Sequence, residues 1–208
     1  MSETDDNSAG GAPSDPAGDA YSEKLPYAPV GALVPDSVAA GVFSTGAVVL
    51  EGPEEFIIDF LQAVTRPPRV GARVVMTPRV MGQFIEALKD NLGKYEGRFG
   101  PPKPLPQRDP KARPDLREMY NDLRLADSEL SGAYATAVMI GHSPSEFFFD
   151  FITRFFPRAA VSSRVYMSAS QVPHVLATLT KSLENRRGRG PSQPPGAAPG
   201  SDGQRTGG

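Results

Sequence analysis

The residues best placed for chemistry are two pairs of carboxylates, each on a stretch with the alternation of a β-strand. Glu55 and Asp59 share one strand face, and Glu146 and Asp150 share the corresponding face of another. Four residues of extended chain separate the members of a pair by roughly 13 Å, whereas the acid pairs of glycosidases lie roughly 5 to 9.5 Å apart. We therefore expect these carboxylates to be solvated or ion-paired, without a role in acid-base catalysis.

The histidines do not supply an active site. The chain has two, His142 at an expected hairpin turn and His174 at an expected helix start, too few for a zinc cluster or a catalytic triad. Cysteine is absent, which removes a thiolate metal cage and a cysteine nucleophile, and no glycine-rich phosphate loop is present. We therefore predict surface histidines and a protein that is not an enzyme, with no metal site and no cofactor.

Aromatic residues near the middle of the second half offer a binding surface. Strand alternation directs every second phenylalanine inward and leaves Phe148 on the outer face, which it shares with Arg164 and Tyr166 of the next strand. The inward residues are Phe147, Phe149 and Phe151. We hypothesise that Phe148, Arg164 and Tyr166 form a binding site, because exposed aromatic and arginine residues can stack on bases or contact a protein. Packing between the two halves of the chain is the competing explanation.

The chain contains two copies of one module, which a shift of 91 residues superimposes without a gap. The shift carries Glu55 onto Glu146 and also brings the following residues into register: Asp36 with Asp127, Gly41 with Gly132, Phe56 with Phe147, Asp59 with Asp150, Arg73 with Arg164, and Leu88 with Leu179. We predict that Asp59 faces Arg73 on the adjacent strand, and that Asp150 likewise faces Arg164. Exposed cross-strand pairs of this kind contribute roughly 0.2 to 1 kcal/mol.

Each copy is predicted to form three strands and a helix. In the first copy the strands are expected over residues 42–50, 55–60 and 70–77. Thr77 then has the features of an N-cap, with Pro78 at the first helical position. The apolar stripe of that helix consists of Val80, Met81, Phe84, Leu88, Leu92 and Tyr95. Because a module of about 60 residues buries only a small core, we predict an α+β fold in which two β-β-β-α repeats share one core as a pseudo-twofold unit.

Composition divides the rest of the chain into two tails and a linker. Residues 1–30 form an acidic tail and residues 188–208 are rich in Gly, Pro, Ser and Gln, so both are expected to be disordered. The repeats are placed at residues 34–100 and 125–187. The proline-rich linker between them, residues 101–124, is expected to be extended and to end in a short helix.

The charge distribution bears on partners and location. The formal net charge is −2, but residues 1–33 hold six acidic residues and one lysine, so the remainder carries about +3. That excess is small for a generic nucleic-acid-binding protein. The chain has no run of 18 apolar residues, and its first residues are acidic where a signal peptide would be basic. We therefore expect a cytoplasmic protein that does not bind membranes.

Three short runs of sequence carry a resemblance to a known family. They are Glu146-Phe147-Phe148-Phe149-Asp150-Phe151, Ser163-Arg164-Val165 and Asn91-Leu92-Gly93-Lys94-Tyr95-Glu96-Gly97-Arg98-Phe99-Gly100. With these runs the chain resembles a tandem copy of DUF3467, a bacterial family of unknown function. The resemblance covers each repeat almost entirely and implies the fold and the repeat boundaries, but no activity. The first copy departs from the family pattern at Ser44-Thr45-Gly46, and the second lacks the Tyr-Glu-x-x-Phe-Gly ending after its helix.

These observations favour a non-catalytic binding or scaffolding protein built from two duplicated modules. Its partner is expected to be another protein or a second copy of the chain. The alternative is a single-stranded nucleic-acid-binding protein that uses the outer sheet face, by analogy with small α+β folds that do so. Salt separates the two hypotheses, because binding through phosphate contacts weakens steeply as the salt concentration rises.

Overall fold

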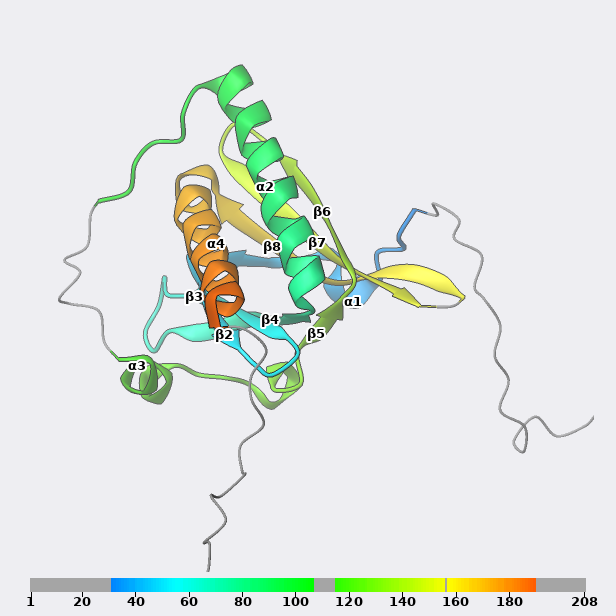
Figure 1. The fold of residues 1–208 in the computed structure, drawn as a ribbon, viewed down its shortest axis with the longest axis vertical. Coiled ribbons are helices and arrows are strands. Elements are labelled where there is room, and N and C mark those ends of the chain that lie inside the picture. The colour runs from blue at the N-terminus through cyan, green and yellow to red at the C-terminus, as the bar shows by residue number, and fades with distance from the viewer. Residues whose placement is uncertain (1–30, 107–114, 156, 190–208) are drawn as a thin grey trace, which may run out of the picture.

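The computed structural model describes residues 31–106, 115–155 and 157–189, so the whole expected N-terminal tail, the expected C-terminal tail from residue 190 and part of the linker lie outside it. Within these residues the fold is α+β, with two four-stranded sheets and four α-helices (Figure 1). The first repeat forms α1 (Asp36–Ala39), β1 (Val42–Ser44), β2 (Gly46–Glu51), β3 (Phe56–Gln62), β4 (Arg69–Met76) and α2 (Pro78–Phe99). The linker contains α3 (Leu116–Asp122). The second repeat forms the 3-10 helix η2 (Asp127–Glu129), β5 (Ala133–Ala135), β6 (Ala137–His142), β7 (Glu146–Phe155), β8 (Arg158–Ser168), the 3-10 helix η3 (Ala169–Gln171) and α4 (Val172–Arg189).

The single strand predicted over residues 42–50 is wrong, because the chain bends at Thr45 and enters a second sheet. β1 lies in sheet A, with strand order β1-β8-β7-β6, and β2 begins sheet B, with strand order β2-β3-β4-β5. At the bend the backbone N–H of Thr45 donates to the carbonyl of Leu61 at 2.8 Å, and that of Thr136 donates to Ile152 at 2.8 Å. Strands that switch sheets form the corners between packed sheets. Each copy therefore supplies four strands, not three.

The two repeats are interwoven. β1 of the first repeat pairs in parallel with β8, and β5 of the second repeat pairs in parallel with β4. The long helices cross over as well, since α2 packs on β6 and α4 packs on β2. The two helices also pack against each other and lie side by side (Figure 1). Neither repeat has a complete sheet or a helix layer of its own.

One hydrophobic core joins the two repeats, as predicted. The inward phenylalanines of both copies are fully buried, and the rings of Phe60 and Phe151 lie 5.5 Å apart between centroids. Phe84 of α2 meets Phe149 and Phe151 edge-on, at 5.6 Å in both cases. Aromatic pairs at these distances add about 0.5 to 1.5 kcal/mol beyond the area that they bury. The core therefore links α2 of the first repeat directly to the sheet of the second.

The long helix of the first repeat begins at the N-cap that the sequence predicts, whereas that of the second repeat is preceded by a 3-10 helix. Thr77 is the N-cap of α2, its Oγ1 accepts from the N–H of Val80 at 3.4 Å, and the helix ends at Gly100 with a φ of 80°. The short linker helix α3 is also present and begins with a capping box at Asp115. Ser168 makes no capping hydrogen bond with its side chain, since η3 intervenes before α4. α4 runs through Arg189, beyond the expected start of the tail at residue 188.

Candidate functional site

The two predicted charge pairs are present, and both are built into the sheets. Asp59 is in register with Arg73, whose Nε and Nη2 donate to the two carboxylate oxygens at 2.7 and 2.8 Å. Asp150 is in register with Arg164, with corresponding distances of 2.6 and 2.7 Å. The expectation of exposed pairs is wrong, because both carboxylates are 0% exposed. The hydrogen bond to Asp150 raises the pKa of the Arg164 guanidinium.

The segment before each first strand covers the charge pair of the other repeat. Nη1 of Arg164 donates to the carbonyl of Ala39 at 3.3 Å, and Nη1 of Arg73 donates to that of Leu130 at 3.2 Å. Gly41 follows with a φ of 63°, and a Cβ there would lie 2.6 Å from the Tyr166 ring. The segment can lie this close to the sheet because glycine has no side chain and tolerates a positive φ. Strand alternation did not reveal this cover, which comes from the opposite repeat.

Tyr120 of α3 adds a third partner to the Asp59–Arg73 pair. Its hydroxyl donates to Oδ2 of Asp59. Burial, together with this hydrogen bond, raises the pKa of Tyr120. The shift of 91 residues places Pro29 at the equivalent position, which has no hydroxyl. Sequence reasoning placed Tyr120 on a helix but had no reason to connect it with Asp59.

Three aromatic side chains lie in register across the outer face of sheet A, and we call Phe43, Tyr166 and Phe148 the aromatic row. Phe43 of β1 pairs with Tyr166 of β8, which pairs with Phe148 of β7. Phe43 is 46% exposed, and the other two are partly exposed. The Phe148 ring lies on Gly141, where a Cβ would come within 2.3 Å of it. Two members of the row were predicted from sequence, and Phe43 was missed because it belongs to the first repeat.

Sheet B shows what the fold requires at these positions. The residues equivalent to the aromatic row are Tyr134, Val75 and Ile57, in the same register across β5, β4 and β3. The central positions are therefore aliphatic in one sheet and aromatic in the other. Arg164, the third predicted site residue, lies beside the aromatic row, but Asp150 and Ala39 accept its hydrogen bonds. It is placed to hold the surface in position.

The histidines differ from each other in their surroundings. His174 is exposed on α4, as predicted, whereas His142 is only partly exposed. The His142 ring packs at 5.2 Å from Phe147 and 5.7 Å from Tyr95, and its buried Nδ1 has no hydrogen-bond partner among the described residues. The reason is that α2 of the first repeat crosses over the end of β6. Among the described residues, no group of three or more His, Cys, Asp or Glu could hold a metal ion.

The carboxylates behave as structural groups. Asp59 and Asp150 are ion-paired, which is one of the two states, solvated or ion-paired, expected from the sequence. Glu146 is exposed at the start of β7, where its Oε2 accepts from the Ser143 hydroxyl at 2.6 Å. It shares the outer face of sheet A with Phe148, two residues further along β7. A negative charge therefore lies beside the aromatic row.

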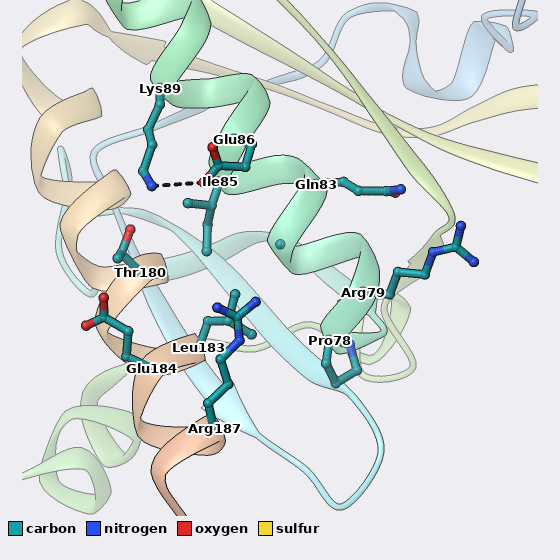
Figure 2. Close-up of a pocket in the computed structure, with 11 residues that line it drawn as sticks. Pro78, Arg79, Gln83, Ile85, Glu86, Lys89, Thr180, Leu183, Glu184 and Arg187 are labelled. Carbon is teal, nitrogen blue, oxygen red and sulfur yellow. Dashed lines mark hydrogen bonds and ion pairs between the residues drawn. The ribbon is translucent and has the colours of Figure 1, made fainter.

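A groove of about 600 Å³ is lined by residues of α2 and α4 beside their contact (Figure 2). The buried side chains of Ile85 and Leu183 contribute to its lining. Its charged residues are of both signs: Arg79, Glu86, Lys89, Glu184 and Arg187. Lys89 and Glu86 already pair at 2.9 Å, shown by the dashed line in Figure 2. The groove therefore selects no particular ligand charge.

Comparison with known proteins identifies one matching family, whose function is unknown. The family model "Protein of unknown function (DUF3467)" matches residues 3–104 and, a second time, residues 106–188. The two matches stand in tandem and meet in the proline-rich linker. No curated protein matches the sequence. Among the described helices, none is both long and apolar enough to cross a membrane.

Proposed function

Because the chain belongs to the DUF3467 family and carries two tandem copies of its domain, we propose that it is a non-catalytic binding protein that captures a protein partner on the outer face of sheet A. The observation that carries the proposal is the aromatic row, to which both repeats contribute. Exposed aromatic clusters mark interfaces more often than isolated apolar residues do. The equivalent positions in sheet B show that the fold does not require aromatic side chains at its centre.

The surroundings of the aromatic row favour a protein over a nucleic acid. Binding of single strands needs stacking surfaces together with cations that contact phosphates. The nearest arginine, Arg164, donates to Asp150 and to the Ala39 carbonyl, and the carboxylate of Glu146 would repel a phosphate backbone. The nucleic-acid hypothesis is therefore supported by stacking alone. Protein interfaces use buried aromatic anchors surrounded by polar groups, which fits this arrangement.

We also propose that the repeats form a pseudo-twofold unit equivalent to a dimer of single domains. Both sheets contain a register shift at corresponding positions, Phe60/Leu61 and Phe151/Ile152. Isolated bridges also occur at corresponding positions, since Leu33 meets Ala160 and Arg124 meets Arg69. Fusion of two copies makes the two faces independent, so one can change without the other. This independence explains how only sheet A acquired the aromatic row.

A capture experiment tests the proposed function. The full-length chain is used as bait in a cell lysate, with and without nuclease, beside the double variant Phe148→Ala/Tyr166→Ala. We expect proteins that bind the wild type in both conditions and are lost from the variant. Capture that disappears with nuclease, or that falls steeply as salt is raised, would favour the nucleic-acid hypothesis. Equal capture by the variant would contradict any role for this face.

A further inference from the structure

We propose that a second site, where the β3–β4 hairpin meets the linker, binds a phosphate-bearing small molecule. A cavity of about 960 Å³ lies there, and its lining includes Arg66, Arg69 and Arg124. We call it the arginine cavity. Its volume is within the range of roughly 300 to 1,000 Å³ typical of small-molecule sites. The aromatic row does not line it.

Backbone pairing brings two of the arginines together. Arg69 at the start of β4 and Arg124 of the linker form a parallel bridge. The N–H of Val70 donates to the Arg124 carbonyl at 2.9 Å, and the N–H of Arg124 donates to the Pro68 carbonyl at 2.9 Å. Nε of Arg69 donates to Oε1 of Gln62 at 2.5 Å. This hydrogen bond orients the guanidinium without using Nη1 or Nη2. The backbones of Arg69 and Arg124 are thus held side by side, and these two arginines and Arg66, all three exposed, line the same cavity.

The charge of the cavity is uncompensated within the described part of the chain. Glu129 is the single acidic residue in its lining, against three arginines, and none of these arginines forms an ion pair there. Like charges held close together repel, and a bound anion relieves the repulsion. Arginine presents a planar fork of donors that matches phosphate in two-point hydrogen bonding. The arrangement therefore selects a phosphoryl group.

The equivalent positions at sheet A show that the fold does not need these arginines. The residues equivalent to Arg66 and Arg69 are Pro157 and Ala160, and the residue equivalent to Arg124 is Leu33. Leu33 and Ala160 form the same parallel bridge that joins Arg124 and Arg69. The backbone is thus maintained by apolar side chains in one copy and carries positive charge in the other. A requirement of folding would apply to both copies, so the arginines indicate a ligand.

The remaining lining indicates what the phosphoryl group is attached to. Apolar side chains complete the cavity, including Val42, Val70, Leu123 and Leu125. An inorganic anion would leave this apolar surface in contact with water, whereas a nucleotide would cover it with a ring system. We therefore use ADP as the main probe and inorganic pyrophosphate as the probe for the anionic part alone.

Isothermal titration of the full-length chain with each probe tests the site. The variants Arg69→Ala and Arg124→Leu introduce the residues of the equivalent bridge, Ala160 and Leu33, so they are expected to fold, which circular dichroism checks. Each should weaken ADP binding by about tenfold or more, because it removes a charge-assisted hydrogen bond to a phosphate oxygen. The matched control is Arg79→Ala, an exposed arginine in the groove between α2 and α4.

The site is supported if ADP binds more tightly than pyrophosphate and both cavity variants weaken binding while the control does not. The absence of binding by either probe to the wild-type chain would overturn the proposal. An equal loss in Arg79→Ala would also overturn it, since general charge attraction would then account for the binding. The unfolding midpoint of each variant, measured without ligand, shows whether a loss of binding reflects a loss of folded protein.

Discussion

Arg164 holds the buried carboxylate of Asp150 through two parallel hydrogen bonds, at 2.6 and 2.7 Å, on adjacent strands of sheet A. The carboxylate is 0% exposed, while the arginine side chain keeps 19% of its surface exposed. A buried carboxylate that loses its cation is left without compensation for the water it gave up. The loss of one partner should therefore lower the free energy of unfolding more in this pair than in the exposed ion pairs on the helices.

A double-mutant cycle measures that difference. We expect Arg164→Gln to lower the free energy of unfolding by roughly 3 to 5 kcal/mol, the cost of breaking a buried pair. The cycle with Asp150→Asn, followed by urea denaturation, should give a coupling energy well above 1 kcal/mol. The exposed pair Lys94–Asp90 on α2 is the control, with an expected coupling of about 0.3 to 0.5 kcal/mol. Equal coupling in the two cycles would contradict the structural role of Arg164.

Tyr120→Phe should lower the free energy of unfolding by about 1 to 2 kcal/mol, because its hydroxyl donates to the buried carboxylate of Asp59. Burial and this hydrogen bond raise the pKa of Tyr120 above its ordinary value of 10.0. The contribution is therefore complete below pH 10 and is lost as the pH rises through the raised pKa of the folded state. Urea denaturation across this range should show the two proteins converging at high pH. For the exposed Tyr134, the variant Tyr134→Phe should track the wild type throughout.

Gly41→Ala and Gly93→Ala should change stability in opposite directions. At Gly41 a Cβ would meet the Tyr166 ring at 2.6 Å and the Arg164 side chain at 2.8 Å, and the φ is 63°. At Gly93 in α2 nothing lies within 4 Å of a Cβ. Thermal unfolding should show a loss of about 1 to 3 kcal/mol for Gly41→Ala, and a gain of about 0.5 to 1 kcal/mol for Gly93→Ala. A neutral Gly41→Ala would show that the segment before β1 does not need its close approach to sheet A.

Residues 125–187 expressed alone should not form a folded monomer. Sheet A would lack β1 beside β8, and β6 would lack the cover of α2. The fragment should be unfolded, or should form a dimer in which a second copy replaces the first repeat. An NMR spectrum at low concentration, with sedimentation to give the mass, checks this expectation. A well-dispersed spectrum from a monomer would show that the repeat folds independently.

The sequence predicts those features of the fold that depend on neighbouring residues. The cap at Thr77 and the alternation that buries Phe56 follow from local spacing, and duplication together with alternation places Asp59 opposite Arg73. The bend at Thr45 was missed, although Ser44, Thr45 and Gly46 interrupt the apolar residues between Val42 and Leu50, because such an interruption does not distinguish a kink within one strand from a switch between two sheets. Once that bend was missed, the pairing of β1 with β8 was missed with it.

The candidate site likewise combines residues that local alternation predicts with residues that only long-range pairing brings in. Phe148 and Tyr166 were predicted from alternation within one repeat, but Phe43 comes from the other repeat and joins them through long-range pairing. Tyr120 and His142 also owe their surroundings to elements of the opposite repeat or of the linker. The sequence carries no local pattern for such contacts. An internal repeat suggests that the copies share a core without showing which strands they exchange.

The central claim is that the outer face of sheet A binds a partner, and Phe43→Ala tests it most directly. Phe43 is 46% exposed, so its truncation should leave the free energy of unfolding within about 1 kcal/mol of the wild type. Quantitative capture from one lysate should compare the wild type, Phe43→Ala and a control variant, Val64→Ala. Val64 is 78% exposed. We predict a set of proteins, insensitive to nuclease, that wild type and Val64→Ala retain and Phe43→Ala loses. The same set of proteins on all three baits, with Phe43→Ala fully folded, would contradict the account.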